Sequence, residues 1–452
     1  MIMKEKQSLS ASELHFQKMT KTPVSRLIIR LGMPTTISML ITSIYNMADT
    51  YFVGTLGESA QAATGILFAL QSVIQGIAFM LGHGSGTLVA KALAQKDSKE
   101  ASRYISTAFF TGGTVGCVIM ILGLLLLTPL MRLLGSTETI LPHARDYGMW
   151  VLIACPFMIC SLILNNNLRF EGKAFFAMFG LTTGGILNII GDYYLVRVAG
   201  LGVYGAGLAT AASQVVSFLI LLVMYCTKAQ GKIRLSFISK KLGDYLSIMR
   251  VGLPSLIRQG LTAISGSLLN NLTKPFGDAA IAAMSVVNRY SMFVMCVGLG
   301  IGQGFQPVAA FNYEAGEVKR VRKGLLFTMG FSAVFVGMMS VCTFFFAESI
   351  ITLFQDLPEV VRIGAKALRF AAFGLLFMPL SVPVNMLYQS IRKAGIASLL
   401  STLRSGALLI PTLLIGVPFL GLTGIQIAQP LSDCLTGLIS IPFILRFLHK
   451  GR

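Results

Sequence analysis

Two acidic residues lie inside long apolar segments of the first half of this sequence, where charged side chains are rare. Asp49 stands in the segment SMLITSIYNMADTYFVG, and Asp192 stands in NIIGDYYLVRVAGLGVYGAGLAT, which runs from Asn188 to Thr210. An ionisable group within a membrane span costs about 2.5–3.5 kcal/mol on insertion scales, so each acid is a functional-site candidate. No Lys or Arg lies in the interior of an apolar segment of the first half. A mobile cation is therefore the expected partner of these acids.

Four side chains of the first half could form one site. Asn188 and Asp192 are four residues apart and share a helix face, Thr210 lies a few residues into the following segment, and Asp49 lies late in the first one. Two carboxylates, an amide and a hydroxyl are oxygen ligands that suit Na⁺ as a hard cation. They equally suit a shared proton, because two nearby carboxylates in a poorly solvated cleft do not both ionise readily. The structural alternative is that each acid caps or hydrogen-bonds a broken helix.

The composition predicts an integral membrane protein. Of the 452 residues, 54% are hydrophobic and only 12% are charged, whereas a soluble domain is about a quarter charged. Residues 1–26 are polar and basic and do not read as a signal peptide. Seven scattered cysteines and four histidines show no metal-binding spacing. The net charge of +19 would suggest nucleic acid in a soluble protein, but here the charge bias of membrane loops explains it better, and no nucleic-acid partner is expected.

Apolar segments long enough to cross the hydrocarbon core recur along the whole chain. Strands of a membrane barrel would be shorter and would alternate in polarity, so we predict an all-α integral membrane protein with twelve transmembrane helices. The predicted spans lie near 27–53, 61–83, 104–127, 145–168, 175–198, 204–226, 250–272, 281–305, 325–346, 366–390, 396–417 and 424–446.

The basic residues predict the orientation. On one side of the membrane the tails and loops carry 27 Lys and Arg, and on the other side they carry seven. Because cytoplasmic loops carry the excess of Lys and Arg, both termini should be cytoplasmic. The predicted cytoplasmic segments are an N-terminal tail at 1–26, a basic linker at 227–249 and a C-terminal tail at 447–452.

The chain is also a tandem repeat. A shift of 220 residues aligns Arg30-Leu-Gly-Met-Pro34 with Arg250-Val-Gly-Leu-Pro254, and it aligns Asn165 with Asn385. Each half carries six spans, so both repeats enter from the same side. We therefore predict an N-lobe at 27–226 and a C-lobe at 250–446, related by a pseudo-twofold axis along the membrane normal.

The second half lacks the acids of the first. Leu269 falls opposite Asp49, and Thr412 falls opposite Asp192. The intramembrane charged residues of the second half are Arg258, Arg289, Arg404 and Asp433. For these residues a structural ion pair, of Asp433 with Arg258 or Arg404, is at least as reasonable as a transport role.

A glycine-rich run, GHGSGT at Gly82–Thr87, resembles a phosphate loop superficially. It lacks the lysine that a phosphate loop places after its last glycine, and its repeat copy GQGFQP keeps the glycines but no phosphate chemistry. Close helix packing or a cytoplasmic turn is the better interpretation.

At this point the chain resembles the multidrug and toxic compound extrusion (MATE) transporters, over about residues 25–447. The resemblance rests on RLGMPTTISMLITSIYNMADTYFVG with Asp49, on NIIGDYYLVRVAGLGVYGAGLAT, and on QPVAAFNYEAGEVKRVRK at Gln306–Lys323, which is similar to the bacterial MepA-type branch. It implies two six-helix lobes forming a V. Tyr193 departs from the family, which often has proline after the acid matched by Asp192.

The resemblance also implies a function. A family member exports cationic drugs through the cell (inner) membrane by alternating access, in exchange for H⁺ or Na⁺, as a monomer and with no cofactor beyond the transported ion. The family's cation site carries over onto Asp49, Asn188, Asp192 and Thr210, and its N-lobe cavity onto Tyr147 and Asn165.

Other functions remain open at this stage. A lipid-linked saccharide flippase of a related fold would favour a strongly cationic central cavity and often extra spans, whereas the first half here is acidic. A major-facilitator carrier has six-span repeats, but its basic loop motif after the second span is missing. A membrane enzyme is less favoured, since no nucleophile or metal constellation appears.

Overall fold

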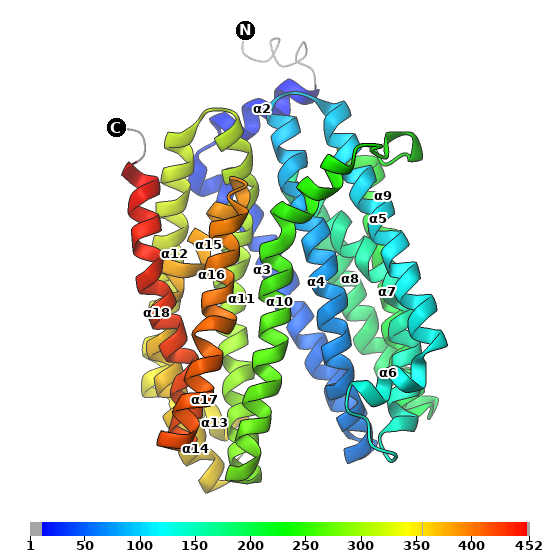
Figure 1. The fold of residues 1–452 in the computed structure, drawn as a ribbon, viewed down its shortest axis with the longest axis vertical. Helices are drawn as coiled ribbons and strands as arrows, with labels where there is room; N and C mark the ends of the chain where they lie inside the picture. The colour runs from blue at the N-terminus through cyan, green and yellow to red at the C-terminus, as the bar shows by residue number, and fades with distance from the viewer. Residues whose placement is uncertain (1–10, 355, 450–452) are drawn as a thin grey trace.

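The computed structural model of the chain describes residues 11–354 and 356–449, and most of these residues lie in long helices that run side by side (Figure 1). Within a bilayer every backbone N–H and C=O must be bonded inside the protein, and a helix meets this requirement along its whole length. The helices form two lobes. The short helix α2 (Ala11–Lys21) and the last turn of α18 (Leu422–His449) lie at the same end of the bundle, called here the α2 end.

The first half of the chain forms the N-lobe. A short helix, α6 (Leu127–Leu133), follows the third of its long helices in the chain and precedes the fourth. The long helices are α3 (Val24–Gly54), α4 (Glu58–Ala94), α5 (Ser98–Leu125), α7 (Leu141–Phe170), α8 (Ala174–Asp192) with the π-helix η1 (Tyr193–Val198), and α9 (Gly202–Lys228).

The second half forms the C-lobe, in which one span is broken and another contains a π-helical segment. The 3₁₀ turns η2 (Leu235–Phe237) and η3 (Lys274–Phe276) flank its first helix. Its other elements are α10 (Leu242–Thr273), α11 (Asp278–Glu314), α12 (Val318–Phe345), α13 (Ala347–Phe354), α14 (Pro358–Leu375), α15 (Met378–Ser390), α16 (Ala394–Thr402), the π-helix η4 (Leu403–Ala407), α17 (Leu409–Leu420) and α18.

The membrane spans agree with the predicted number. Ten helices of the described chain are long and apolar enough to cross a membrane, when a helix and its π segment count as one. α14 and α15 qualify together as an eleventh span, bent by 51°. α10 is the twelfth, since its 32 residues are long enough although polar side chains such as Arg258 and Gln259 lower its hydropathy. The prediction of twelve helices in two lobes is confirmed, but the break between α14 and α15 was not foreseen.

Glycines bring the two lobes into close contact at the α2 end. Gly84 of α4 lies against the Ile248 carbonyl of α10, and Gly304 of α11 lies against the Ile28 carbonyl of α3. These two contacts are related by the 220-residue repeat, so the interface itself is pseudo-symmetric. A Cβ atom at Gly84 or Gly304 would overlap the backbone of the facing helix. The interpretation of Gly82–Thr87 as a packing motif is thereby confirmed, and the run lies inside α4 rather than in a turn.

Toward the opposite end the lobes separate, and their ribbons diverge (Figure 1). Thr36 of α3 meets Gly300 of α11, but Met47, three helical turns further along the same face, is 40% exposed. On α11 the corresponding residues Met292 and Phe293 are each 47% exposed. The inner faces of both lobes are therefore open at this end and closed at the α2 end.

Helix α2 bridges the two lobes. On the N-lobe side, Lys96 lies over the ring of Phe16, with 5.4 Å from Nζ to the ring centroid. On the C-lobe side, Phe16 packs against Phe311, and Arg320 Nη2 donates to the carbonyl of Met19 at 3.3 Å. Met19 is completely buried. The helix is thus part of the packed structure, although it falls within the range predicted as a tail.

The side chain of His15 is buried in this bridge. Burial lowers the pKa of His15 from 6.5 to about 4, and the positive charges of Lys173 and Lys18 add to the effect. The folded chain therefore favours neutral His15, whereas the undocked helix binds a proton below about pH 6.5. The contribution of this histidine to docking is complete above pH 6.5 and is lost as the pH falls toward 4.

The linker between the lobes is anchored to the N-lobe. α10 begins at Leu242, within the range 227–249 predicted for the linker. The carboxylate of Glu171, which is fully buried, accepts hydrogen bonds from the backbone N–H groups of Gln230 at 2.6 Å and Gly231 at 3.2 Å. The first linker residues are therefore fixed against the α2 end of α7.

The chain ends bear on two further predicted boundaries. The predicted N-terminal tail, 1–26, contains α2 and the start of α3, and its first ten residues lie outside the described residues. The predicted C-terminal tail begins at 447, whereas α18 continues to His449 and residues 450–452 lie outside the described part.

Candidate functional site

Small residues bring four N-lobe helices together around the predicted site. Gly185 of α8 lies against the ring of Tyr45 on α3, and Gly191 of α8 lies against Ala209 on α9. Gly207 of α9 packs directly on α7. Glycine and alanine let helix backbones approach closely in a membrane. The polar side chains at the level of these contacts are consequently held within reach of one another.

A chain of hydrogen bonds joins four of these polar residues. Tyr147 OH donates to Asp49 Oδ2 at 2.8 Å, and the Tyr147 and Thr210 hydroxyl oxygens are 3.4 Å apart. Asn188 Nδ2 donates to Thr210 Oγ1 at 3.2 Å. Since Tyr147 uses its single hydrogen on Asp49, the hydrogen of Thr210 is left for Tyr147. The donors therefore all point from Asn188 toward Asp49.

Four acceptor oxygens at this site have no hydrogen-bond donor among the residues that the structure describes. They are Asp49 Oδ1, Asn188 Oδ1 and both carboxylate oxygens of Asp192, and all four are buried. Asp192 itself is fully buried. A buried acceptor without a partner costs about 1–3 kcal/mol, and more when it is charged. The site as formed by the protein alone therefore favours an added cation or proton.

Asp192 lies near Asp49 but outside the hydrogen-bonded chain. The negative charge of Asp49 acts on Asp192, and the charges of both acids act on Tyr147. Two like charges in a poorly solvated interior raise each other's energy, and one positive charge between them relieves both. The sequence prediction that Asp49, Asn188, Asp192 and Thr210 come together thus agrees with their placement, although their role in ion coupling stays a prediction.

The helix that carries Asp192 changes its winding directly after this residue. α8 ends at Asp192 and continues as the π-helix η1, which begins at Tyr193. Single π turns are rare and occur frequently at functional sites. At Tyr193, where members of the family that the sequence resembles often have proline, the chain therefore makes a wider helical turn rather than a proline break.

Two further predicted residues are placed differently. Tyr147, expected to line a substrate cavity, belongs to the hydrogen-bonded chain with Asp49. Asn165 lies outside it, and its Nδ2 donates to the carbonyl of Ala177 at 2.9 Å. Asn385 makes the same bond to Ala397 at 2.7 Å in the C-lobe, so this helix contact is repeated. The contribution of Asn165 to a substrate cavity stays a prediction.

The matching region of the C-lobe holds no acid pair. Leu269 is buried, and the Thr412 hydroxyl donates to the backbone carbonyl of Leu408 at 2.6 Å. Arg404 Nε donates to Asp433 Oδ1 at 2.8 Å, and both side chains are largely buried. Of the two ion pairs considered from the sequence, the structure forms the one with Arg404.

We expect Asp433→Asn to lower the amount and thermal stability of folded protein more than it lowers the response to an ion gradient. Breaking a buried ion pair leaves an uncompensated charge and costs about 3–5 kcal/mol. The measurement is the apparent melting temperature in detergent beside efflux per folded molecule. Asp278→Asn, at an exposed position at the start of α11, is the control. A well-folded Asp433→Asn protein that binds drug but ignores both gradients would contradict this role.

The sequence reasoning missed a second layer around the acids. Tyr45 lies one helical turn before Asp49, and Gln214 lies one turn after Thr210. Gln214 lies beside Tyr45, and the charge of Asp49 acts on Tyr45. Their four-residue spacing from two predicted site residues is the signal that could have found them.

A second missed group is a buried polar network across the lobe interface. Arg169 of α7 donates to Gln303 Oε1 of α11, and its Nη2 lies 2.9 Å from His83 Nε2 of α4. His83 Nδ1 lies 2.8 Å from Ser255 Oγ of α10, which also accepts from Gln389 Nε2 at 2.8 Å. His83 and Gln303, like Arg169 and Gln389, are 220 residues apart. Polar residues recurring at the repeat distance within apolar segments could have indicated this network.

The chain matches known proteins over nearly its whole length. The family model MatE matches residues 34–194 and 254–415. The multidrug export protein MepA of Staphylococcus aureus (strain MSSA476) is 26% identical over 433 residues, which cover 94% of this chain and 95% of MepA. MepA of Staphylococcus saprophyticus is 25% identical over 432 residues, with the same coverage.

The fold is also found among solved structures. The outward-facing conformation of a multidrug resistance MATE family transporter superposes with a TM-score of 0.89 at 24% sequence identity. The match covers 95% of this chain and 97% of that transporter. At this identity the likeness establishes the fold, with its two six-helix lobes.

Proposed function

Because this chain belongs to the multidrug and toxic compound extrusion (MATE) family of transporters, we propose that it exports cationic amphipathic compounds in exchange for H⁺ or Na⁺. Members of the family are multi-pass membrane transporters that extrude drugs, and they are not enzymes. We further propose that the chain works as a monomer in the cell (inner) membrane with both termini in the cytoplasm. The finer points, namely the ion, the substrate class and the orientation, are part of the proposal.

One observation carries the coupling proposal: four buried acceptor oxygens without a donor, in a site that holds two carboxylates. A cation or proton bound there supplies the missing positive charge. A cationic drug in the cleft competes for the same negative charge. The two cannot be satisfied together, and this competition is the physical basis of exchange.

The energy available for such exchange is sufficient. One proton that enters down about 100 mV and one pH unit releases roughly 2.3 plus 1.4 kcal/mol. This corresponds to a concentration ratio of several hundredfold for a neutral substrate. A monovalent cation that leaves the cell moves its charge against the same 100 mV, so a one-for-one exchange is driven by the pH unit alone and supports a ratio of about tenfold.

The lobe arrangement supports alternating access. The lobes are closed at the α2 end by glycine contacts and by the Arg169 network, and their inner faces are exposed at the opposite end. With the termini in the cytoplasm, this is an outward-open arrangement. Export then requires the contacts at the α2 end to break and the opposite end to close.

Ethidium efflux from membrane vesicles tests the proposal. A pH gradient and a sodium gradient are imposed separately on vesicles that contain the unaltered protein. Efflux that follows one of the two gradients identifies the coupling ion. Efflux that follows neither gradient, at normal protein levels, would refute ion-driven export.

The topology has its own test. We expect a cysteine at Lys96 or Lys319 to react with a membrane-impermeant reagent only after the cytoplasmic side is exposed, because the loops at the α2 end carry the excess of basic residues. A cysteine at Thr55, beside the turn that follows α3 at the opposite end, is the matched control and should react from outside. Labelling of a cysteine at position 96 or 319 in intact cells would show that the orientation is the opposite of the proposed one.

A further inference from the structure

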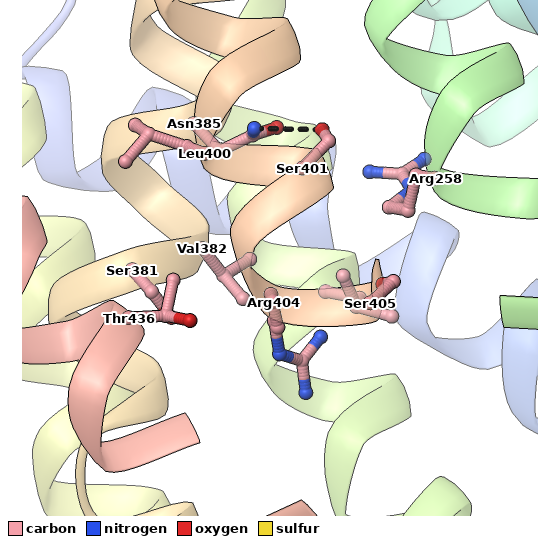
Figure 2. A pocket seen from close by; sticks show the side chains of 10 residues that line it. Arg258, Ser381, Val382, Asn385, Leu400, Ser401, Arg404, Ser405 and Thr436 are labelled. Carbon is pink, nitrogen blue, oxygen red and sulfur yellow. Dashed lines mark hydrogen bonds between the residues drawn. The ribbon is translucent and has the colours of Figure 1, made fainter. Parts of the chain in front are cut away.

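The C-lobe contains a pocket with two arginines that the proposed drug and ion exchange does not use. Figure 2 shows it between α10, α15, α16 and α18, with side chains from each of these helices turned toward it. The volume of its cavity is about 30 Å³. Its polar lining includes Arg258, Asn385, Ser401, Arg404 and Thr436.

The positive charge of this pocket is incompletely neutralised. Arg404 is paired with Asp433 at 2.8 Å, and Gln429 Nε2 also donates to that carboxylate, at 3.1 Å. Arg258 forms no ion pair with any described residue, and the charge of Arg404 acts on it repulsively. Two guanidinium groups and one carboxylate leave one unit of positive charge at the pocket.

A hydroxyl donor stands beside the unpaired arginine. Asn385 Nδ2 donates to Ser401 Oγ at 2.9 Å, so the Ser401 hydrogen remains free for another acceptor. In Figure 2 the Arg258 guanidinium is turned toward Ser401 across the pocket. A planar group with two oxygens can accept from the arginine and from the hydroxyl together.

The remaining lining is apolar and comes from Leu299, Val382 and Leu400. Such walls do not favour a small hydrated ion, but they fit the carbon skeleton next to an anionic head. A cavity of about 30 Å³ has room for one or two water-sized groups, such as the two oxygens of a carboxylate, and not for a whole ligand. The space therefore suits the charged end of a larger molecule.

We propose that this pocket, with Arg258 and Ser401 as its donors, binds the carboxylate of an amphipathic organic molecule. The single excess positive charge matches one monovalent anionic group. The binding stands on the pocket alone, whereas export of a molecule bound there rests on the proposed function.

Binding to the purified full-length protein in nanodiscs of phosphatidylcholine tests the site. Fluorescence anisotropy compares pyrenebutyrate with pyrenebutanol, which has the same skeleton without the negative charge. We expect the carboxylate to bind at least about tenfold more tightly, and Arg258→Gln to remove this difference, since a hydrogen bond to a charged group is lost. Arg258→Lys, which keeps the charge, should restore part of it.

The matched control is Arg289→Gln. Arg289 is an exposed intramembrane arginine on α11 that does not line the pocket, so this substitution removes the same charge elsewhere. Equal affinities for the two pyrene compounds, or the same loss in Arg258→Gln and Arg289→Gln, would overturn the assignment. Comparable melting temperatures of the two variants verify that both are folded.

Two other sources of negative charge are separated in the same assay. Displacement of pyrenebutyrate by millimolar chloride would show a site for an inorganic anion and would overturn the organic carboxylate. Displacement in nanodiscs of phosphatidylglycerol would do the same in favour of a lipid headgroup. Ethidium carries no anionic group, so its efflux by the unaltered protein tests the proposed function independently of this pocket.

Discussion

Asp192→Asn and Asp49→Asn should each reduce gradient-driven export at least tenfold while the protein remains folded. Both acids contribute unpartnered, buried oxygen atoms to one site, and under the proposed coupling each substitution removes negative charge that would hold the ion. Switching a two-state element from 1:99 to 99:1 takes about 5.5 kcal/mol of differential binding, which one carboxylate and three neutral oxygens no longer supply. The asparagine side chains nearly preserve volume, so packing around α8 should survive.

The double variant distinguishes a shared site from two separate ones. Residues that act as one unit lose nearly everything with the first substitution, so Asp49→Asn with Asp192→Asn should be hardly worse than either alone. Efflux is measured per folded molecule in vesicles, with Asp278→Asn as the exposed control. Losses that multiply, or full gradient-dependent efflux in either single variant, would exclude the shared site.

Gly252→Ala should disable transport by a different route. Gly252 of α10 faces the Met80 carbonyl of α4, and an added Cβ atom would overlap that carbonyl group. Backbone cannot move aside as a flexible side chain can, and overpacking typically costs about 1–3 kcal/mol or more. The closed arrangement at the α2 end should therefore lose population by roughly tenfold or more.

The same helix provides the control for this prediction. Gly260 of α10 has nothing near the position of an added Cβ atom, so Gly260→Ala introduces the same methyl group without overlap. Paired measurements of efflux and of melting temperature compare the two variants. If Gly252→Ala behaves like Gly260→Ala in both, the close contact between the lobes does not matter for the transport cycle.

The candidate site was predictable because its signals are local. Asp49 and Asp192 stand out against apolar surroundings, and Asn188 follows from the helical spacing. The position of Tyr147 between Asp49 and Thr210 could not be predicted from the sequence, since it depends on how α7 packs against α3 and α9. Sequence patterns within one helix do not specify the rotation of a distant helix.

In the fold, too, some features could be predicted from the sequence and others could not. Apolar length predicted the spans, and the repeat predicted the two lobes. The bend between α14 and α15 and the π-helices η1 and η4 were not anticipated, because each depends on small local changes of helical winding that apolar length does not record. The bridging helix α2 was also missed, since its buried face contacts residues from both lobes.

The contacts of helix α2 with the C-lobe can form only late in the synthesis of the protein. The carbonyl oxygen of Met19 accepts hydrogen bonds from the side chains of Asn312 and Arg320, which follow it by 293 and 301 residues. At about 5–20 residues per second, a ribosome needs roughly 15–60 s to make this intervening chain. Helix α2 is thus synthesised well before the C-lobe residues that hold it, and it reaches its final place late. Until then its apolar residues, Phe16 and Met19, need a temporary cover, which a membrane surface or a chaperone can provide.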